Sequence, residues 1–190
     1  MVARPIDEVR GAHLRAPARP FPPLGRLVAP TGRAIESLSL EVQAGRTVWL
    51  AALADGGAAR ADPATGRWLP GVGEAEARAL ARARLLRAPA IRSAVRTAAD
   101  QPPIDLRRAR PAWGVTFAGG ARVYVDADTG AVLALRTDQW RLFDWMWGLH
   151  IMDLGGREDT SHPVLIAAAA LALLATLLGL VLLPFAVRRR

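Results

Sequence analysis

The stretch from Pro163 to Val187 contains no charged residue, and Arg188, Arg189 and Arg190 follow it directly. A helix rises about 1.5 Å per residue, so about 20 residues cross the ~30 Å hydrocarbon layer of a bilayer. Lipid offers the backbone no hydrogen-bond partner, so a stretch that crosses it must be helical. The sequence therefore predicts one transmembrane helix over 163–187, which anchors the chain close to its C-terminal end.

The charges on either side of this stretch predict its orientation. Three arginines follow it, whereas Arg157 is the only Arg within about 15 residues before it, and Glu158 and Asp159 lie beside it. Arginines close to a span stay on the cytoplasmic side. We therefore expect the tail 188–190 in the bacterial cytoplasm and residues 1–162 in the periplasm, outside the inner membrane. Thr160 or Ser161 is expected to cap the helix, which begins at Pro163.

Composition excludes several classes of site. The chain contains no Cys, which rules out disulfides and thiolate metal sites, and three His, at positions 13, 150 and 162, leave little material for a metal centre. All 25 basic residues are Arg and the net charge is +8, yet they are scattered, with no basic run before the tail. The densest group, Arg107 to Arg110, is interpreted as a solvated loop, and nucleic-acid binding is not expected.

Residues 1–27 are rich in Pro and Arg without a clear period, which is typical of an extended connector. The opening segment, MVARPIDEVRG, contains no apolar stretch that could start export. Two explanations stay open at this point. Either the domain lies inside the cell, against the arginine rule, or the natural protein begins further upstream.

Strand and helix patterns follow one another twice between residues 28 and 137. A short helix is expected over TGRAIESL (31–38), then strands over 38–45 and 46–53, a turn at Asp55-Gly56-Gly57 and a returning strand. A second helix is expected over 73–86, with Glu early and Arg late as the helix dipole favours. Further strands are expected over 90–98 and within 112–135.

The two strand sets share a D-x-x-T-G turn. Glycine supplies the positive φ of such a turn, and the Asp and Thr side chains bind its backbone. The first copy consists of Asp62, Thr65 and Gly66, and the second, 64 residues later, of Asp126, Thr129 and Gly130. Gly56-Gly57 matches Gly119-Gly120 at an offset of 63. The repeat predicts two tandem α+β units, 28–70 and 71–137, each a helix packed on an antiparallel sheet.

The second turn resembles two kinds of chemical site without completing either. Asp128-Thr129-Gly130-Ala131 is similar to an aspartic-protease signature, but the first copy has Ala64 where the second has Asp128, so the shared feature is the turn. Asp126 and Asp128 also form a fragment of a calcium loop whose remaining ligands are missing. We therefore expect a structural turn, no catalytic residue and no metal site.

Residues 138–162 are expected to form a juxtamembrane helix and a turn. Trp140, Phe143, Trp147 and Ile151 share one face of this helix, and Leu142, Trp145, Met146 and Leu149 the other. Trp at this density beside a span suits the headgroup belt, so the lipid bilayer is an expected partner. The charged residues Asp144, Asp153, Arg157, Glu158 and Asp159 either form an ion-pair network or fix the junction between domain and span; we favour the second.

Four segments together resemble a PepSY-domain membrane protein. They are PIDEVRG (5–11), W-x-V-x-F (113–117), VYVDADTG (123–130) and WRLFDWMWGLHIMDLGGRED (140–159). The resemblance implies small α+β units in tandem outside the inner membrane. It also implies another span just before the first segment, so we expect that the given sequence lacks an upstream transmembrane helix or represents a rarer single-span relative.

The resemblance leaves three functions open. The leading expectation is a non-enzymatic membrane-anchored protein, without a cofactor, that binds or regulates a membrane or periplasmic protein. The second is a haem-b-binding electron-transfer or ferric-reductase-like subunit linked to iron uptake, with His150 as an axial ligand and His162 nearby. The third is a peptidase-inhibitory module.

Overall fold

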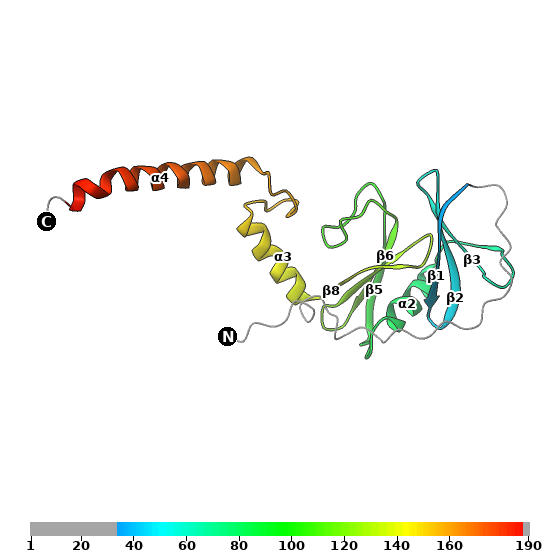
Figure 1. Ribbon diagram of the computed structural model, residues 1–190. Helices are drawn as coiled ribbons and strands as arrows, with labels where there is room; N and C mark the ends of the chain where they lie inside the picture. The colour runs from blue at the N-terminus through cyan, green and yellow to red at the C-terminus, as the bar shows by residue number, and fades with distance from the viewer. Residues whose placement is uncertain (1–33, 188–190) are drawn as a thin grey trace. The chain divides into compact units, whose positions relative to one another are not determined.

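The computed structural model describes residues 34–187, and the chain folds as an α+β protein, as expected (Figure 1). The predictions for the connector 1–27, for PIDEVRG, for His13 and for the tail 188–190 concern residues outside this range. The described elements are β1 (Ile35–Gln43), β2 (Arg46–Leu53), β3 (Ala58–Ala61), β4 (Trp68–Leu69), α2 (Glu74–Ala83), β5 (Ile91–Thr97), β6 (Ala112–Phe117), β7 (Arg122–Asp126), β8 (Val132–Arg136), α3 (Asp138–His150) and α4 (Pro163–Val187). They belong to two compact units, which divide between Trp140 and Arg141.

The first unit contains two antiparallel sheets of the same design. Each has four strands in chain order, β1-β2-β3-β4 and β5-β6-β7-β8. Each also has a β-bulge at the start of its first strand, at Ile35/Ser37 and at Ile91/Ser93. These bulges are 56 residues apart, whereas the D-x-x-T-G turns are 64 apart, so the second sheet has eight more residues between its bulge and its turn. The strands β5 and β6 are each two residues shorter than β1 and β2, so the loop 98–111 contains 14 residues where the loop 44–45 contains two.

The hairpin glycines follow the same 64-residue offset, which corrects the offset of 63 expected for them. Leu53 N–H donates to Gly57 O, and Phe117 N–H donates to Ala121 O. Gly56 therefore corresponds to Gly120, and both adopt a positive φ, of 79° and 83°. The sequence comparison was wrong by one residue because Gly119 extends the glycine pair on the opposite side.

The helix expected over 31–38 is wrong within the described residues, because Ile35 already belongs to β1. The bulge explains the error. Ile35 pairs with Leu53 and Leu38 pairs with Ala51, so both lie on one face of the sheet although they are three residues apart. Apolar residues spaced by three also indicate a helix, so the bulge gave this strand a helical pattern.

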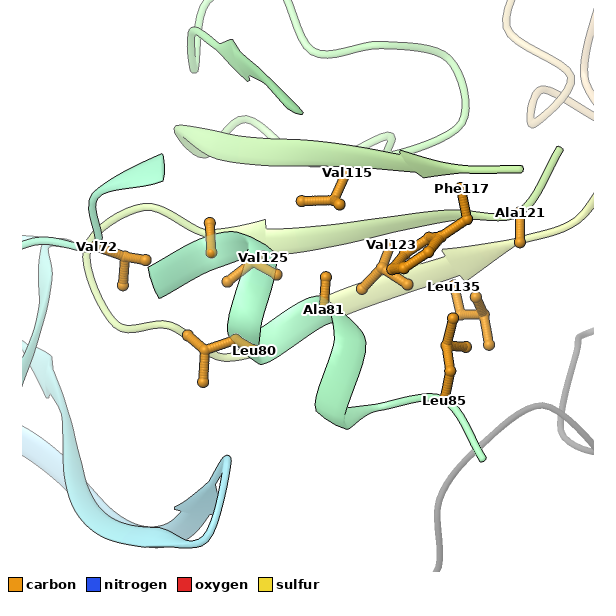
Figure 2. Close-up of a cluster of buried hydrophobic side chains, with 11 residues drawn as sticks. Val72, Leu80, Ala81, Leu85, Val115, Phe117, Ala121, Val123, Val125 and Leu135 are labelled. Carbon is orange, nitrogen blue, oxygen red and sulfur yellow. The ribbon is translucent and has the colours of Figure 1, made fainter. Parts of the chain in front are cut away.

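The helix α2 covers one face of the second sheet (Figure 2). It occupies most of the predicted range 73–86, and its buried residues Ala77, Leu80 and Ala81 pack on the sheet. Burial of a large aliphatic or aromatic side chain stabilises a fold by roughly 1.5–3 kcal/mol. The sheet side of this core consists of Val115, Phe117, Val123, Val125 and Leu135, and the segments flanking α2 add Val72 and Leu85.

A buried arginine connects the first sheet to α2. Arg60 on β3 is 4% exposed, and its guanidinium binds both carboxylate oxygens of Glu76 at 2.7 Å, while its Nε donates to Pro70 O at 3.0 Å. These bonds lower the pKa of Glu76 below its usual value. Gln43 adds a bond from the end of β1 to Thr129 O, at 3.0 Å. The two sheets are thus joined by buried polar contacts.

The long loop between β5 and β6 covers part of the opposite face of the second sheet. Leu106 in this loop packs with Ala112, Tyr124 and Ala134 in a second, smaller core. Gly114 allows the Tyr124 ring to approach, since a Cβ at this position would lie 3.2 Å from ring atom Cε1.

The second unit contains α4, whose bounds agree with the predicted range. In the described part of the chain it is the one helix long and apolar enough to cross a membrane, over Pro163–Pro184, and none of that window is buried. The cap is His162 rather than Thr160 or Ser161, because the residue directly before Pro163 holds the capping position. Its Nδ1 accepts the Val164 N–H at 3.3 Å, and its carbonyl accepts the Ile166 N–H at 3.2 Å.

Replacement of Glu76 by Gln is expected to destabilise the first unit more than replacement of Glu74, which lies in the same turn of α2. Glu76→Gln leaves the buried charge of Arg60 without its carboxylate, at a cost of about 2 kcal/mol. Glu74→Gln removes an exposed pair with Arg78, worth about 0.5 kcal/mol. Urea unfolding of the full chain in detergent measures both.

The same pair predicts a pH dependence. The folded-state pKa of Glu76 is lowered from 4.5, so its stabilisation is complete above about pH 4.5 and is lost as the pH falls through the lowered value. The stability difference between wild type and Glu76→Gln should therefore shrink at acid pH. Equal costs for the Glu74 and Glu76 variants at neutral pH would contradict this account.

Candidate functional site

The helix α3 and the loop after it bring together most of the predicted juxtamembrane residues. Within the second unit, the buried positions of α3 are Asp144 and Gly148, and Ile151 directly after the helix is 4% exposed. The expected face of Phe143, Trp147 and Ile151 is thus divided, because Phe143 and Trp147 are 47% and 42% exposed. The helix turns a carboxylate inward and its aromatic residues outward.

The buried carboxylate of Asp144 binds an arginine of the loop. Arg157 Nη1 lies 3.0 Å from Asp144 Oδ2, and their side chains are 21% and 5% exposed. Gly148 makes room for this arrangement, since a Cβ there would lie 2.8 Å from Arg157 Cγ and 2.9 Å from Asp153 O. Met152 and Arg157 adopt left-handed backbone conformations, with φ of 58° and 59°. Strain of this kind persists where the surrounding contacts hold it in place.

Asp153 organises the loop by binding its backbone. Oδ1 accepts the N–H groups of Gly155 and Gly156, and Oδ2 accepts those of Glu158 and Asp159, at 3.0–3.2 Å. These bonds, led by the one from Asp159, lower the pKa of Asp153 to about 2, although burial acts in the opposite direction. Within the expected charged cluster, Asp144 thus pairs with Arg157, and the carboxylate of Asp153 holds the loop.

The histidines of this region lie apart from that polar centre. His150 is exposed at the end of α3, where its ring centre lies 5.8 Å from that of Trp147. His162 uses Nδ1 to cap α4. Within residues 34–187, no group of three or more His, Asp or Glu side chains is placed to hold a metal ion.

Trp140, the first residue of the juxtamembrane motif, belongs to the first unit. The Arg136 guanidinium carbon lies 4.1 Å from the centre of its ring, and that of Arg107 lies 5.8 Å away. Arg136 Nε also donates to Asp105 O at 2.7 Å. Sequence reasoning missed this cluster and interpreted Arg107 as part of a solvated loop. Arg107 lies in the loop between β5 and β6 and Arg136 at the end of β8, so nothing in their local sequence indicates that they meet on one Trp.

The two D-x-x-T-G turns use the same hydrogen bonds. Asp62 Oδ1 accepts the N–H groups of Ala64 and Thr65, and Asp126 Oδ1 accepts those of Asp128 and Thr129. Thr65 and Thr129 Oγ1 each accept the N–H two residues later, and Gly66 and Gly130 adopt φ of 69° and 75°.

The copies differ in burial. Asp126 is completely buried, and its Oδ2 lies 2.8 Å from Arg110 Nε of the long loop. The carboxylate at the start of each turn, rather than Asp128, binds the backbone of the turn. Sequence reasoning did not identify Arg110 as the partner of Asp126.

Comparison with known proteins adds no relative. No family model matches the chain, and no curated protein or solved structure is significantly similar to it. The resemblance to PepSY-domain membrane proteins therefore stays a proposal.

Replacement of Asp153 by Asn is expected to loosen the loop, because a neutral amide offers one weaker acceptor to four N–H groups. Amide hydrogen exchange of residues 155–159 should accelerate several-fold. Asp159→Asn is the matched control, since Asp159 accepts one exposed N–H, from Ser161 at 2.7 Å. Equal exchange in the two variants would contradict the role of Asp153.

The lowered pKa of Asp153 gives a second readout. Because the folded-state value lies at about 2, the stabilisation by Asp153 is complete above pH 3.8 and is lost only as the pH falls through about 2. An NMR titration of the carboxyl carbon of Asp153 in the full chain should show the lowered midpoint. A midpoint near 3.8 would show that the backbone bonds do not form in solution.

Proposed function

We propose that this chain is a non-enzymatic protein anchored in the bacterial inner membrane by α4, with its two-sheet unit in the periplasm. The observation that carries the anchor is the helix itself: over Pro163–Pro184 its mean hydropathy is 2.7, and none of this window is buried. An apolar helix with no protein cover needs lipid or a partner around it. The bilayer is the environment that covers it along its whole length.

The orientation follows from the flanking charges. Three arginines come directly after α4, whereas Arg157, before it, is paired with Asp144. The Arg157–Asp144 pair has no net charge, so the charge imbalance across α4 favours a cytoplasmic C-terminus.

The resemblance to tandem PepSY-like units is supported by the repetition of the sheets. Two sheets with the same strand order, the same bulge and the same D-x-x-T-G turn follow each other, and α2 packs on the second. We propose that this unit binds or regulates a membrane or periplasmic protein, as the resemblance implies.

A binding role agrees with how the buried polar groups are used. Arg60 is bound to Glu76, Asp126 to Arg110 and the turn backbone, and Asp153 to its loop. Groups committed to the fold in this way are not available for catalysis. The edge strands β1 and β5 offer backbone groups to an extended segment of a partner, and β1 is nine residues long.

A reporter fusion tests the anchor and its direction. A fluorescent protein that matures only in the cytoplasm, fused after Arg190, should be bright, and a periplasmic reporter at the same place should be inactive. Removal of residues 163–190 should make the remaining chain extractable from membranes at alkaline pH, which strips interfacial segments but not membrane-spanning helices. Periplasmic activity of the C-terminal fusion would overturn the orientation, and membrane retention of the truncated chain at alkaline pH would show that α4 is not the sole anchor.

Photo-crosslinking tests the partner surface. A photoreactive residue at Ser39, which is exposed on the edge strand β1, should form a crosslink to one defined protein in cells. Ala64, which is exposed in the first D-x-x-T-G turn, is the matched control and should give none. Equal crosslinking from both positions would speak against recognition through the edge of the sheet.

A further inference from the structure

In the juxtamembrane segment 141–159, most large apolar side chains are exposed and two carboxylates are buried, which is the reverse of the usual arrangement in a soluble protein. Apart from the buried Ile151, its large apolar side chains point outward: the exposed residues are Leu142, Phe143, Trp145, Met146, Trp147, Leu149, Met152 and Leu154, with exposed fractions of 40–62%. Soluble proteins rarely expose a contiguous apolar surface of this kind. Water is therefore an unfavourable environment for this segment.

Two carboxylates of the same segment point inward, whereas His150, Glu158 and Asp159 are exposed. Asp144 is 4% and Asp153 is 7% exposed, and each has partners within the segment: Arg157 for Asp144, and four backbone N–H groups for Asp153. Satisfaction of charges and backbone groups inside the fold is the requirement that lipid imposes on a chain. The segment itself supplies these partners.

We infer that residues 141–159 are immersed in the outer boundary of the bilayer, with lipid covering the outward side of α3. The inference rests on the proposed anchoring by α4. From Arg141 onward, α3 belongs to the same compact unit as α4, and both helices leave large apolar side chains exposed, with the polar stretch 155–162 between them.

Lipid fits this surface better than a protein partner does. At about 3.6 residues per turn, the exposed positions from Leu142 to His150 span roughly 200° of the helix, and Asp144 and Gly148 occupy the remainder. A helix packed on one protein surface presents a stripe of roughly 100°. Lipid can cover the full width of this apolar surface. Trp145 and Trp147 also belong to a residue type that is enriched at the level of the lipid headgroups.

Spin labelling of the full chain in liposomes tests the inference. The chain has no Cys, so a single introduced Cys carries the only label. Met146→Cys places it on α3, Leu174→Cys on α4, and Val95→Cys on the edge strand β5, where Val95 is 59% exposed. The measured quantity is the ratio of collisions with oxygen, which enters lipid, to collisions with a water-soluble nickel complex.

The ratio at position 146 is expected to lie between the other two and to exceed that at 95 several-fold. A ratio at 146 equal to that at 95 would place α3 in water and overturn the inference, while a high ratio at 174 would leave the anchor intact. A low ratio at 174 would instead contradict the anchor. Protection of position 146 from both reagents would show a protein partner or a second copy in place of lipid.

Two variants test whether the Asp144–Arg157 pair is needed for the segment 141–159 to enter the bilayer boundary. Arg157→Gln leaves the Asp144 carboxylate without its cation and should move the label at 146 toward water. The matched double variant, Asp144→Asn with Arg157→Gln, removes both charges and should restore the ratio. Equal ratios in the two variants would show that the Asp144–Arg157 pair does not control the depth of the segment.

Discussion

The bidentate contact between the buried Arg60 and the half-exposed Glu76 holds the two halves of the first unit together. A guanidinium that is 4% exposed must have its charge and its N–H groups satisfied by the chain, and Glu76 and Pro70 O provide for this. Arg60 lies on β3 of the first sheet, and Glu76 lies on α2, the helix that covers the second sheet. Their contact therefore connects the two sheets. The repeat has therefore become one folded unit rather than two independent copies.

The copies have diverged where extra chain was inserted. Both D-x-x-T-G turns make the same backbone bonds, yet Asp126 is completely buried beside Arg110 of the long loop. The same loop supplies Leu106, which packs over Tyr124. An eight-residue insertion thus gave the second sheet a second covered face and required one new charge pair below it.

Local sequence patterns correctly predicted the helices and strands in which the pattern of residues is the same from end to end. The bounds of α4 and of β2 agree with their sequence patterns. The residues of α4 are apolar throughout, and β2 follows the pattern of a single regular strand. The start of β1 was wrong because a bulge places Ile35 and Leu38 on one face at helical spacing. Arg60 and Glu76 are 16 residues apart, and nothing in their neighbourhoods indicates a partner, so that contact required the fold.

In both units the buried charged side chains have partners within the chain, but the exposed surfaces of the two units differ in polarity. In the first unit apolar side chains such as Phe117 are buried, and the buried Arg60 is paired with Glu76, because water is expected outside. In the second unit Asp144 and Asp153 are buried with their partners, and Trp145 and Leu142 are exposed. In both cases a buried charge is satisfied by the chain, and only the exposed surface differs. The change of surface at Arg141 therefore marks the place where we infer that the chain passes from water to lipid.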